Sequence, residues 1–364
     1  MATRLLAIET SCDETGLAVV EQRGSTITVL ANELASQTDI HALTGGVVPN
    51  VAAREHLAVM QPLLRQTLET SNTDRNNLDA IAITVGPGLM PALVIGVQAA
   101  KALSFAWDKP LVPVNHLEGH LYSALLSTVS SKRATFNSQA QEHFPALALL
   151  VSGGHTMLVL MTDHLSYQVI GQTRDDAAGE AFDKVARLLG LPYPGGPALS
   201  RLAGEGNSDS YDFTRPMMNS GDLDFSFSGL KTDVLYTVRN LDQATQERER
   251  ANLAASFQAA AVEALVYKTK QALAKHSPRT LLLAGGVAAN QLLRQKLKQL
   301  AEAEQVPLRI APLDLCGDNG VMIGLAGLRA FQAKRTTPWP DLDATARLSL
   351  DSLPTPQLES TPAH

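Results

Sequence analysis

Two histidines four residues apart, His116 and His120, are the residues whose types and spacing most directly indicate chemistry. Apolar side chains at Leu117 and Leu121 predict that they lie on a helix, and a helix projects residues four apart from one face. Two imidazoles on one face can bind one metal ion, although paired histidines also serve as capping or packing residues. The spacing alone leaves both interpretations open.

Glu118 lies two positions from each histidine. On a helix of 3.6 residues per turn it points about 200° away from either neighbour, so it is poorly placed to act on a water molecule held by the histidines. The zinc-protease pattern H-E-x-x-H is absent. A metalloprotease is therefore a runner-up interpretation and not the main one.

Asp318 is the natural third metal ligand. It is the acidic residue of a glycine turn, Cys316-Gly317-Asp318-Asn319-Gly320, that leads into an apolar helix. An aspartate in this position either caps the helix or binds a metal ion together with histidines.

The segment Leu150-Val151-Ser152-Gly153-Gly154 ends a strand with two adjacent glycines. Without Cβ atoms the main chain can approach phosphate oxygens closely, and the serine adds a hydroxyl group. We favour a phosphate site over a plain turn, because similar glycine turns recur along the chain.

Three other residues are candidates for nucleoside contacts. Asp183 can accept hydrogen bonds from a ribose, and Gly196, in the turn Tyr193–Pro197, would let the main chain lie flat against a sugar or base. Asn290 follows a third glycine turn and can hydrogen-bond a nucleoside. A rigid loop is the alternative for Gly196, since proline and glycine alone are typical of turns.

Asp175 and Asp176 are interpreted as possible caps of the helix that follows them, and Ser228 as the cap of a later helix. Lys231 is expected to be a solvated lysine near the start of that later helix.

The elements that must position these residues occur in two copies. The first copy contains three strands, a long helix, a further strand and, after a glycine turn, a second helix, at residues 4–20 (two strands), 26–36, 49–68, 78–85 and 90–106. Strand, glycine turn and strand return at 144–161, and strand, glycine turn and helix at 280–290. The sequence therefore predicts an α/β protein of two related lobes, the duplicated fold of actin, sugar kinases and Hsp70, with a nucleotide between the lobes.

The predicted boundaries follow from this pattern. Residues 1–126 form the first lobe with the histidine motif, and residues 144–334 the second lobe with the nucleotide-binding turns. Residues 127–143 are a polar surface loop. Residues 335–364 are rich in proline and are expected to be a poorly ordered tail.

Composition limits the class of protein. The 364 residues are 45% hydrophobic, contain two cysteines and carry a formal charge of −6, which argues against a self-sufficient nucleic-acid binder. We expect no membrane span and no signal peptide, and therefore a cytoplasmic protein.

Taken together, the motifs resemble the tRNA threonylcarbamoyladenosine synthesis family, whose bacterial members are tRNA threonylcarbamoyltransferases once described as sialoglycoprotein endopeptidases. The matching motifs run in order along nearly the whole chain: Ile8–Thr15, Gly86–Gly88, His116–His120, Val151–His155, Asp176–Lys184, Tyr193–Pro197, Asp224–Lys231, Ala284–Gly286 and Asp318–Gly320.

The resemblance implies one divalent metal ion, Fe²⁺ in the first place or Zn²⁺, held by His116, His120 and Asp318. It also implies that threonylcarbamoyl-AMP contacts a set of residues on the glycine turns: Leu150, Val151, Ser152, Gly153, Gly154, Asp183, Gly196 and Asn290. Ser200 stands where some relatives have an acidic residue, so a ligand contact there is left open.

The implied reaction transfers the threonylcarbamoyl group to the N6 amine of adenosine 37 in tRNAs reading codons that begin with A, with release of AMP. The implied partners are tRNA, a smaller paralogous subunit and a small ATPase. A non-catalytic ATP-binding scaffold of the Hsp70 type is a third interpretation; it would need the nucleotide turns but not the histidine pair.

Overall fold

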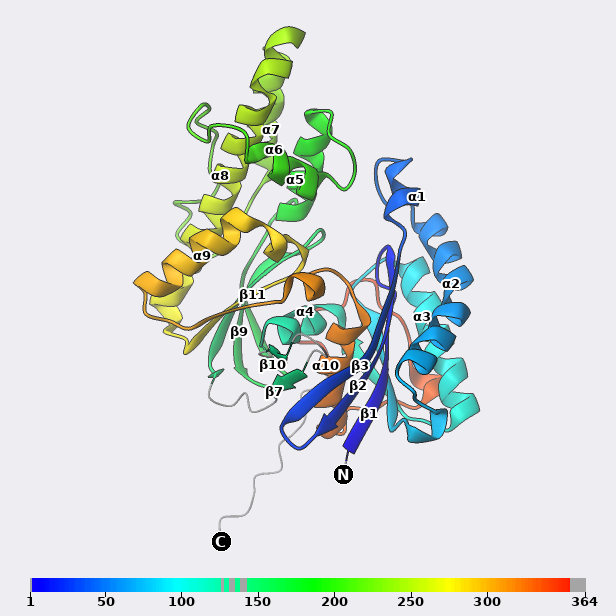
Figure 1. Cartoon of the computed structure of the whole chain (residues 1–364). Coiled ribbons are helices and arrows are strands. Elements are labelled where there is room, and N and C mark those ends of the chain that lie inside the picture. The colour runs from blue at the N-terminus through cyan, green and yellow to red at the C-terminus, as the bar shows by residue number, and fades with distance from the viewer. Residues whose placement is uncertain (1, 126–127, 131–134, 138–142, 354–364) are drawn as a thin grey trace.

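The computed structural model describes residues 2–125, 128–130, 135–137 and 143–353. They form two β-sheets with helices on both faces of each, and the two sheets lie side by side with two helices between them (Figure 1). The predicted α/β class is confirmed.

The two sheets share one topology. The first is ordered β5-β4-β1-β2-β3-β7-β6 and the second β10-β9-β8-β11-β12. In each, three consecutive strands form an antiparallel meander, and two later strands pair in parallel alongside the first strand of that meander. Read from the parallel side, β5-β4-β1-β2-β3 matches β12-β11-β8-β9-β10, which confirms the predicted duplication.

The strands of the first sheet are β1 (Ala2–Glu9), β2 (Glu14–Arg23), β3 (Thr26–Ser36), β4 (Ala80–Gly86), β5 (Leu111–Asn115), β6 (Thr128–Ser130) and β7 (Thr135–Asn137). Those of the second are β8 (Ala146–Val151), β9 (Thr156–Asp163), β10 (Ser166–Gln172), β11 (Thr280–Ala284) and β12 (Leu308–Ile310).

The helices before the second sheet are α1 (Thr38–Ala42), α2 (Pro49–Thr70), α3 (Met90–Trp107) and α4 (His116–Leu125). The later ones are α5 (Ala178–Leu188), α6 (Gly195–Ala203), α7 (Ser228–Arg239), α8 (Gln243–His276), α9 (Gln291–Ala303) and α10 (Gly320–Gln332). Short 3₁₀ turns lie at Arg75–Asn77, Gly286–Ala289, Leu313–Leu315 and Trp339–Asp341.

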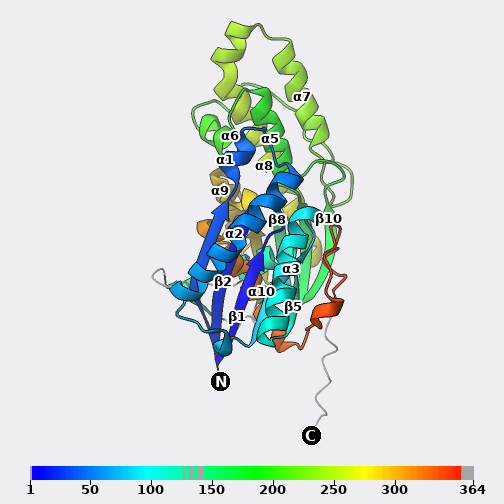
Figure 2. The same ribbon diagram turned by 90° about the vertical axis from the view of Figure 1, so that its right-hand side faces the viewer.

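Strand β1 shows why both faces of the first sheet are covered. Leu6 and Ile8 pack in one core with α2 and α3, whereas Leu5 and Ala7 on the opposite face belong to a second core that continues into the other lobe. A strand buried on both faces reads as an unbroken apolar run. Figure 2 shows α2 and α3 in front of this sheet.

Helix α3 has the length and composition of a membrane span. This differs from the expectation that no segment would reach that length. In the structure α3 packs against β4 and α2, and its buried residues include Ala92, Leu93 and Val97. One such helix is weak evidence for a membrane span, because a helix that packs on a sheet can pass the same test of length and composition.

Helix α10 follows the second sheet in sequence but packs against β1, β2 and β4 of the first. Close approach is possible because a Cβ atom at Gly327 would lie only 2.6 Å from the Cβ of Ala82. Helix α4 comes from the first lobe and packs against β8, β11 and β12 of the second. The two helices contact one another between the sheets, so the lobes share one core.

Residues 335–353 differ from the predicted poorly ordered tail. They run along the first lobe as an extended segment, in which Thr345 donates to Val85 O and Gly88 donates to Ala346 O. Leu342 and Leu350 are buried. The prolines prevent a helix, but the extended backbone pairs with the loops that follow the strands. Residues 354–364 lie outside the described part.

The predicted surface loop 127–143 also differs in part. Its two short strands β6 and β7 pair with each other, and β7 pairs with β3, so they extend the first sheet. Residues 131–134 and 138–142 lie outside the described part.

The contact of α10 with the first sheet gives a first prediction. In most helix interiors a change from glycine to alanine stabilises by roughly 0.5–1 kcal/mol, but Gly327→Ala should destabilise the fold by about 1–3 kcal/mol because the helix must move off Ala82. Thermal unfolding of the ligand-free protein measures this. Gly196→Ala in α6 is the control, since its Cβ would meet its nearest neighbours at 3.9 Å. A Gly327→Ala protein as stable as the control would contradict the packing.

Candidate metal centre and nucleotide site

Helix α4 begins at His116, directly after strand β5, and its start is fixed by its own side chains. Asn115 Oδ1 accepts a hydrogen bond from Leu117 N at 2.9 Å, and Glu118 Oε2 accepts one from Asn115 N at 3.2 Å. The amides at a helix start need such partners. His116 and His120 follow as a pair on consecutive turns, and both are buried.

Asp318 meets both histidines. Its Oδ1 lies 3.5 Å from His116 Nε2 and 3.2 Å from His120 Nε2. The neighbouring Asn319 caps α10 by accepting a hydrogen bond from Met322 N, so capping does not explain Asp318. Ligand atoms of the three predicted metal residues lie within 4.8 Å of one another.

The chemistry of His120 fits a cation at this place. Both of its ring nitrogens are buried and have no hydrogen-bond partner within the described residues; the short approach of Nε2 to Asp318 lacks hydrogen-bond geometry. A buried polar atom without a partner costs about 1–3 kcal/mol. A divalent ion held by two imidazoles and a carboxylate would satisfy Nε2 and the carboxylate together.

His116 is oriented by groups that sequence reasoning missed. Its Nδ1 lies 3.2 Å from Glu9 Oε2 and 3.1 Å from Ser11 Oγ, which leaves Nε2 to face Asp318. Glu9 is completely buried and also accepts hydrogen bonds from Ser11 N and Thr84 Oγ1. A carboxylate behind a histidine is the usual support of a metal ligand. The sequence did contain an indication of this role, because Glu9 is a charged residue at the end of an apolar strand.

Electrostatic interactions couple the three ligands. Burial lowers the pKa of His116, but Asp318 and Glu9 outweigh it and raise this pKa to about 9. Burial opposes ionisation of Asp318, yet His116 and His120 hold its pKa below the usual range. Both pKa shifts favour a protonated imidazole beside an ionised carboxylate.

The glycine turn of the second lobe lies beside this centre. Burial, His116 and His120 together lower the pKa of His155 to about 4, so His155 is neutral. The turn is closed by two hydrogen bonds, from Ser152 N to His155 O and from His155 N to Ser152 Oγ. The charges of the predicted metal ligands therefore act on a residue of the predicted phosphate turn.

Gly153 and Gly154 are exposed, whereas Leu150, Val151 and Ser152 are buried. A Cβ atom built on either glycine would have no protein atom within 4 Å. The fold therefore does not require glycine here, and the open space leaves the main chain accessible to a ligand.

Asp183 and Gly196 meet through a hydrogen bond from Gly196 N to Asp183 Oδ1 at 2.9 Å. Burial raises the pKa of Asp183, and the charge of Asp13 from the turn between β1 and β2 adds to this rise. A charge of the first lobe therefore adds to the effect of burial on Asp183.

Asn290 is occupied by protein contacts. Its Nδ2 donates to Ser200 Oγ at 2.9 Å and to Gln258 Oε1 at 2.8 Å, and its Oδ1 accepts from Leu293 N, which caps α9. The amide donors expected to meet a nucleoside are therefore used within the protein, and Ser200 belongs to the same small network.

The residues interpreted as caps have other partners. Asp175 Oδ1 accepts from Phe227 N and Ser228 N and so caps α7, while Ser228 itself makes no cap. Asp176 binds both Lys184 and Lys231 in ion pairs of 2.7 and 2.6 Å. Lys231 is therefore a paired residue and not a solvated one.

Glu118 cannot serve as the base of a peptidase. Its carboxylate is fully buried and accepts two hydrogen bonds from Arg335, at 2.9 and 2.6 Å. A general base must reach the water or group whose proton it takes. The metalloprotease alternative is not favoured by this arrangement.

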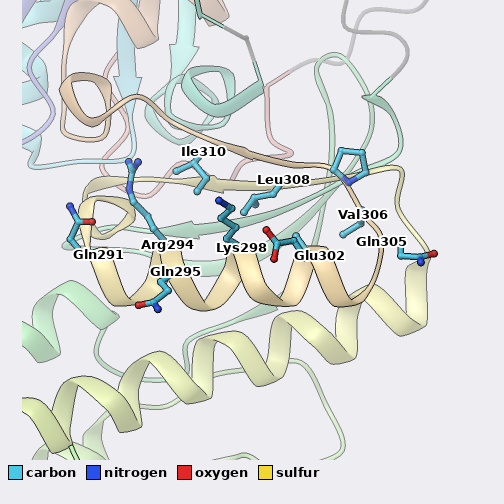
Figure 3. Close-up of a pocket in the computed structure, with 11 residues that line it drawn as sticks. Gln291, Arg294, Gln295, Lys298, Glu302, Gln305, Val306, Leu308 and Ile310 are labelled. Atoms are coloured by element: carbon cyan, nitrogen blue, oxygen red, sulfur yellow. The ribbon is translucent and has the colours of Figure 1, made fainter. Parts of the chain in front are cut away.

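Figure 3 shows a groove of about 810 Å³ between α9 and β12, lined by Arg294, Lys298 and Glu302 among others. Its lining contains none of the predicted metal or nucleotide residues. We do not assign it to the site.

Solved structures with a similar fold are known. HypF of T. kodakarensis matches with a TM-score of 0.59 and 15% identity over 93% of this chain and 48% of that one. A phosphate- and nucleotide-bound HypF matches with a TM-score of 0.58 and 12% identity over 91% of this chain and 47% of that one. This chain spans about half the length of each. These likenesses show the fold alone, and they agree with the predicted two-lobe α/β class.

Sequence comparison then gives the family. The family model for tRNA N6-adenosine threonylcarbamoyltransferase, TsaD, matches residues 28–325. Proteins of that name are 47% identical in Staphylococcus saprophyticus (91% of this chain, 92% of that one) and 45% identical in Moorella thermoacetica (97% and 96%). The chain belongs to the tRNA N6-adenosine threonylcarbamoyltransferase family. It is a transferase that modifies tRNA, as the motifs predicted.

The raised pKa of His116 predicts how metal binding depends on pH. Its Nε2 must lose a proton before it can bind a cation, so affinity should rise with pH between about 6 and about 8, by up to about tenfold per unit. Competition with a chelator of known affinity measures this, corrected for the titration of the chelator. An affinity that does not change over this range would contradict a protonated His116 in the metal-free protein.

Proposed function

We propose that the chain transfers the threonylcarbamoyl group of threonylcarbamoyl-AMP to the N6 amine of adenosine 37 in tRNAs that read codons beginning with A. The amine nitrogen forms a bond to the carbamoyl carbon, the bond from this carbon to the phosphate oxygen breaks, and AMP leaves. The amine loses one proton. The observation that carries the proposal is the meeting of His116, His120 and Asp318 in a chain that belongs to a family named for this transfer.

The adenylate is held, in this proposal, by Leu150, Val151, Ser152, Gly153, Gly154, Asp183 and Gly196, with Asn290 in a supporting role. The open space at Gly153 and Gly154 supports the phosphate position, because main-chain N–H groups there can donate to its oxygens. Asp183 accepts hydrogen bonds from the ribose. Asn290 acts indirectly, by fixing the hydroxyl group of Ser200 and the start of α9.

His116, His120 and Asp318 would hold one divalent ion, Fe²⁺ in this proposal and Zn²⁺ as the alternative. When bound, such an ion supplies Lewis-acid polarisation of a carbonyl oxygen. Glu9 keeps the ring of His116 in the orientation that a ligand needs. Neutral His155, in the phosphate turn, can donate a hydrogen bond to a substrate oxygen without adding a charge.

The chain is proposed to work in the cytoplasm with tRNA, a smaller paralogous subunit and a small ATPase. Its formal charge of −6 supports the need for partners, because tRNA binding relies on positive charge. We further propose the first lobe at 1–126 and the second at 144–334 as the two units of the ligand site, although α10 packs on the first sheet.

Gly153→Val tests the nucleotide site. The branched side chain would occupy the open space beside the turn, so affinity for AMP should fall at least about tenfold while the melting temperature stays unchanged. Calorimetric titration with AMP measures the affinity, and Gly153→Ala provides a smaller step in the same direction. A folded Gly153→Val protein with unchanged affinity would remove this turn from the site.

His120→Ala and Asp318→Asn test the metal centre and its use together. Both should lower metal content and formation of threonylcarbamoyladenosine, because each removes one of three ligands. The assay combines purified partners, threonine, bicarbonate, ATP and unmodified tRNA, followed by nucleoside analysis. Lys298→Ala, in the groove on α9, is the control and should retain both properties. Full activity in a metal-free variant would overturn the proposed role of the centre.

A further inference from the structure

The two residues that flank helix α10 both bind helix α4. Asp318 precedes α10 by two positions and meets His116 and His120, while Arg335 follows the end of α10 by three positions and binds Glu118. The metal ligands of α4 therefore contact a residue at the start of α10, and Glu118 of α4 forms an ion pair with a residue just after the end of α10.

The ion pair of Glu118 and Arg335 is buried and bidentate. Nη1 of Arg335 donates to Oε1 at 2.9 Å and Nη2 donates to Oε2 at 2.6 Å. Glu118 is fully buried and Arg335 is 7% exposed. Two parallel hydrogen bonds fix orientation as well as distance, which a single contact does not. The pair therefore restrains rotation of α4 about its own axis.

The backbone around Glu118 is tied to the same C-terminal segment. Glu118 Oε2 also accepts from Asn115 N, and Asn115 Nδ2 donates to Ser349 O at 3.0 Å. Arg335 itself is held by a hydrogen bond from its N–H to Ala330 O, at the end of α10. These contacts connect the first turn of α4 with residues 335–349.

Packing holds α4 in place, and polar contacts add orientation to it. All ten residues of α4 are buried, and the helix packs against α10 and against strands of both sheets. Gly119 faces α10, and a Cβ atom there would lie 2.9 Å from Ile323 Cδ1 and 3.0 Å from Met322 Cγ. Glycine brings the two helices close but adds no side chain to this contact, so the polar contacts of Glu118 and Asp318 contribute to the angle at which His116 and His120 face Asp318.

We propose that Arg335 is a positioning residue for the metal centre, acting through Glu118 to fix the rotation of α4 against α10. This rests on the proposed role of His116, His120 and Asp318 as ligands. On a helix, Glu118 projects about 200° from each histidine. The ion pair with Arg335 therefore restrains the side of α4 that lies away from the metal ligands. Without this ion pair, metal binding must itself order the two imidazoles. The cost of ordering them lowers the affinity for the metal ion.

The test compares Arg335→Met and Arg335→Lys with wild type. Affinity for Zn²⁺ is measured by chelator competition, at a temperature where circular dichroism shows each protein to be folded. Arg335→Met should bind at least about tenfold more weakly but still saturate at one ion per chain. Arg335→Lys keeps the positive charge but cannot form two parallel hydrogen bonds to Glu118, so its affinity for Zn²⁺ should lie between those of wild type and Arg335→Met. Unchanged affinity in folded Arg335→Met would overturn the proposal.

Arg4→Met is the matched control. Arg4 donates twice to Glu21 in the same lobe, so its removal also breaks an ion pair, but it has no contact with α4 among the described residues. Its affinity for Zn²⁺ should equal that of wild type. An equal weakening in Arg4→Met would show a general loss of stability and would overturn the proposal as well.

A double variant covers the case in which Arg335→Met does not fold. Glu118→Met with Arg335→Met leaves no unpaired buried charge, and removing both members of a buried pair is often tolerated. It should fold, bind Zn²⁺ weakly, and show faster hydrogen exchange at the amides of α4 than wild type in the metal-free state. Wild-type exchange rates together with wild-type affinity would contradict the positioning role.

The proposed function fails by a different result. If wild type binds no Zn²⁺, or if Asp318→Asn binds it as tightly as wild type, then the three residues are not the ligands. The positioning role is tested only if wild type binds Zn²⁺ more tightly than Asp318→Asn does. Given that difference, unchanged Zn²⁺ affinity in Arg335→Met contradicts the positioning role alone. One set of titrations therefore separates the two failures.

Discussion

The packing of α4 against α10 is the contact on which the candidate centre depends. The two helices follow the last parallel strand of each copy of the duplicated fold. They meet between the sheets at Gly119, where a side chain would collide with Ile323. This contact brings His120 and Asp318 within 3.2 Å although 198 positions separate them in sequence. The lobes cannot be separated without taking the ligands apart. Folding of the two-lobe core and assembly of the centre are therefore one event, and metal binding should stabilise the interface between the lobes.

Local patterns carried most of the fold. Apolar runs joined by a short polar turn predicted β1 and β2, and residues 26–36 form the third strand as predicted. The duplication was visible because each copy combines a hairpin with a strand, a glycine turn and a helix, and both sheets have the same strand order. The apolar positions Leu117 and Leu121 predicted that His116 and His120 lie on a helix, and α4 carries both. These features depend on neighbours in sequence, which is why reading the chain revealed them.

Partners distant in sequence could not be predicted. Nothing near Glu118 indicates that Arg335 neutralises it, and nothing near Asp175 indicates that it caps α7 across the lobe. Proline content suggested a poorly ordered tail from residue 335, but composition does not report that an extended backbone finds acceptors on the first lobe. Asn290 has the right chemistry for a nucleoside, yet three protein groups use its hydrogen bonds. In each case the residue type shows which groups a side chain can bind, but its actual partner depends on which residues the fold brings next to it.

The central claim is that two histidines of α4 and the aspartate before α10 form one metal centre. X-ray absorption spectroscopy of the protein loaded with one equivalent of Zn²⁺ tests it most directly. The account predicts a first shell of nitrogen and oxygen atoms only, at roughly 2.0–2.2 Å, with the multiple-scattering signal of two imidazoles. This signal should fall to one imidazole in His120→Ala. A sulfur atom at about 2.3 Å, from Cys12 or Cys316, or an unchanged two-imidazole signal in His120→Ala, would contradict the assignment.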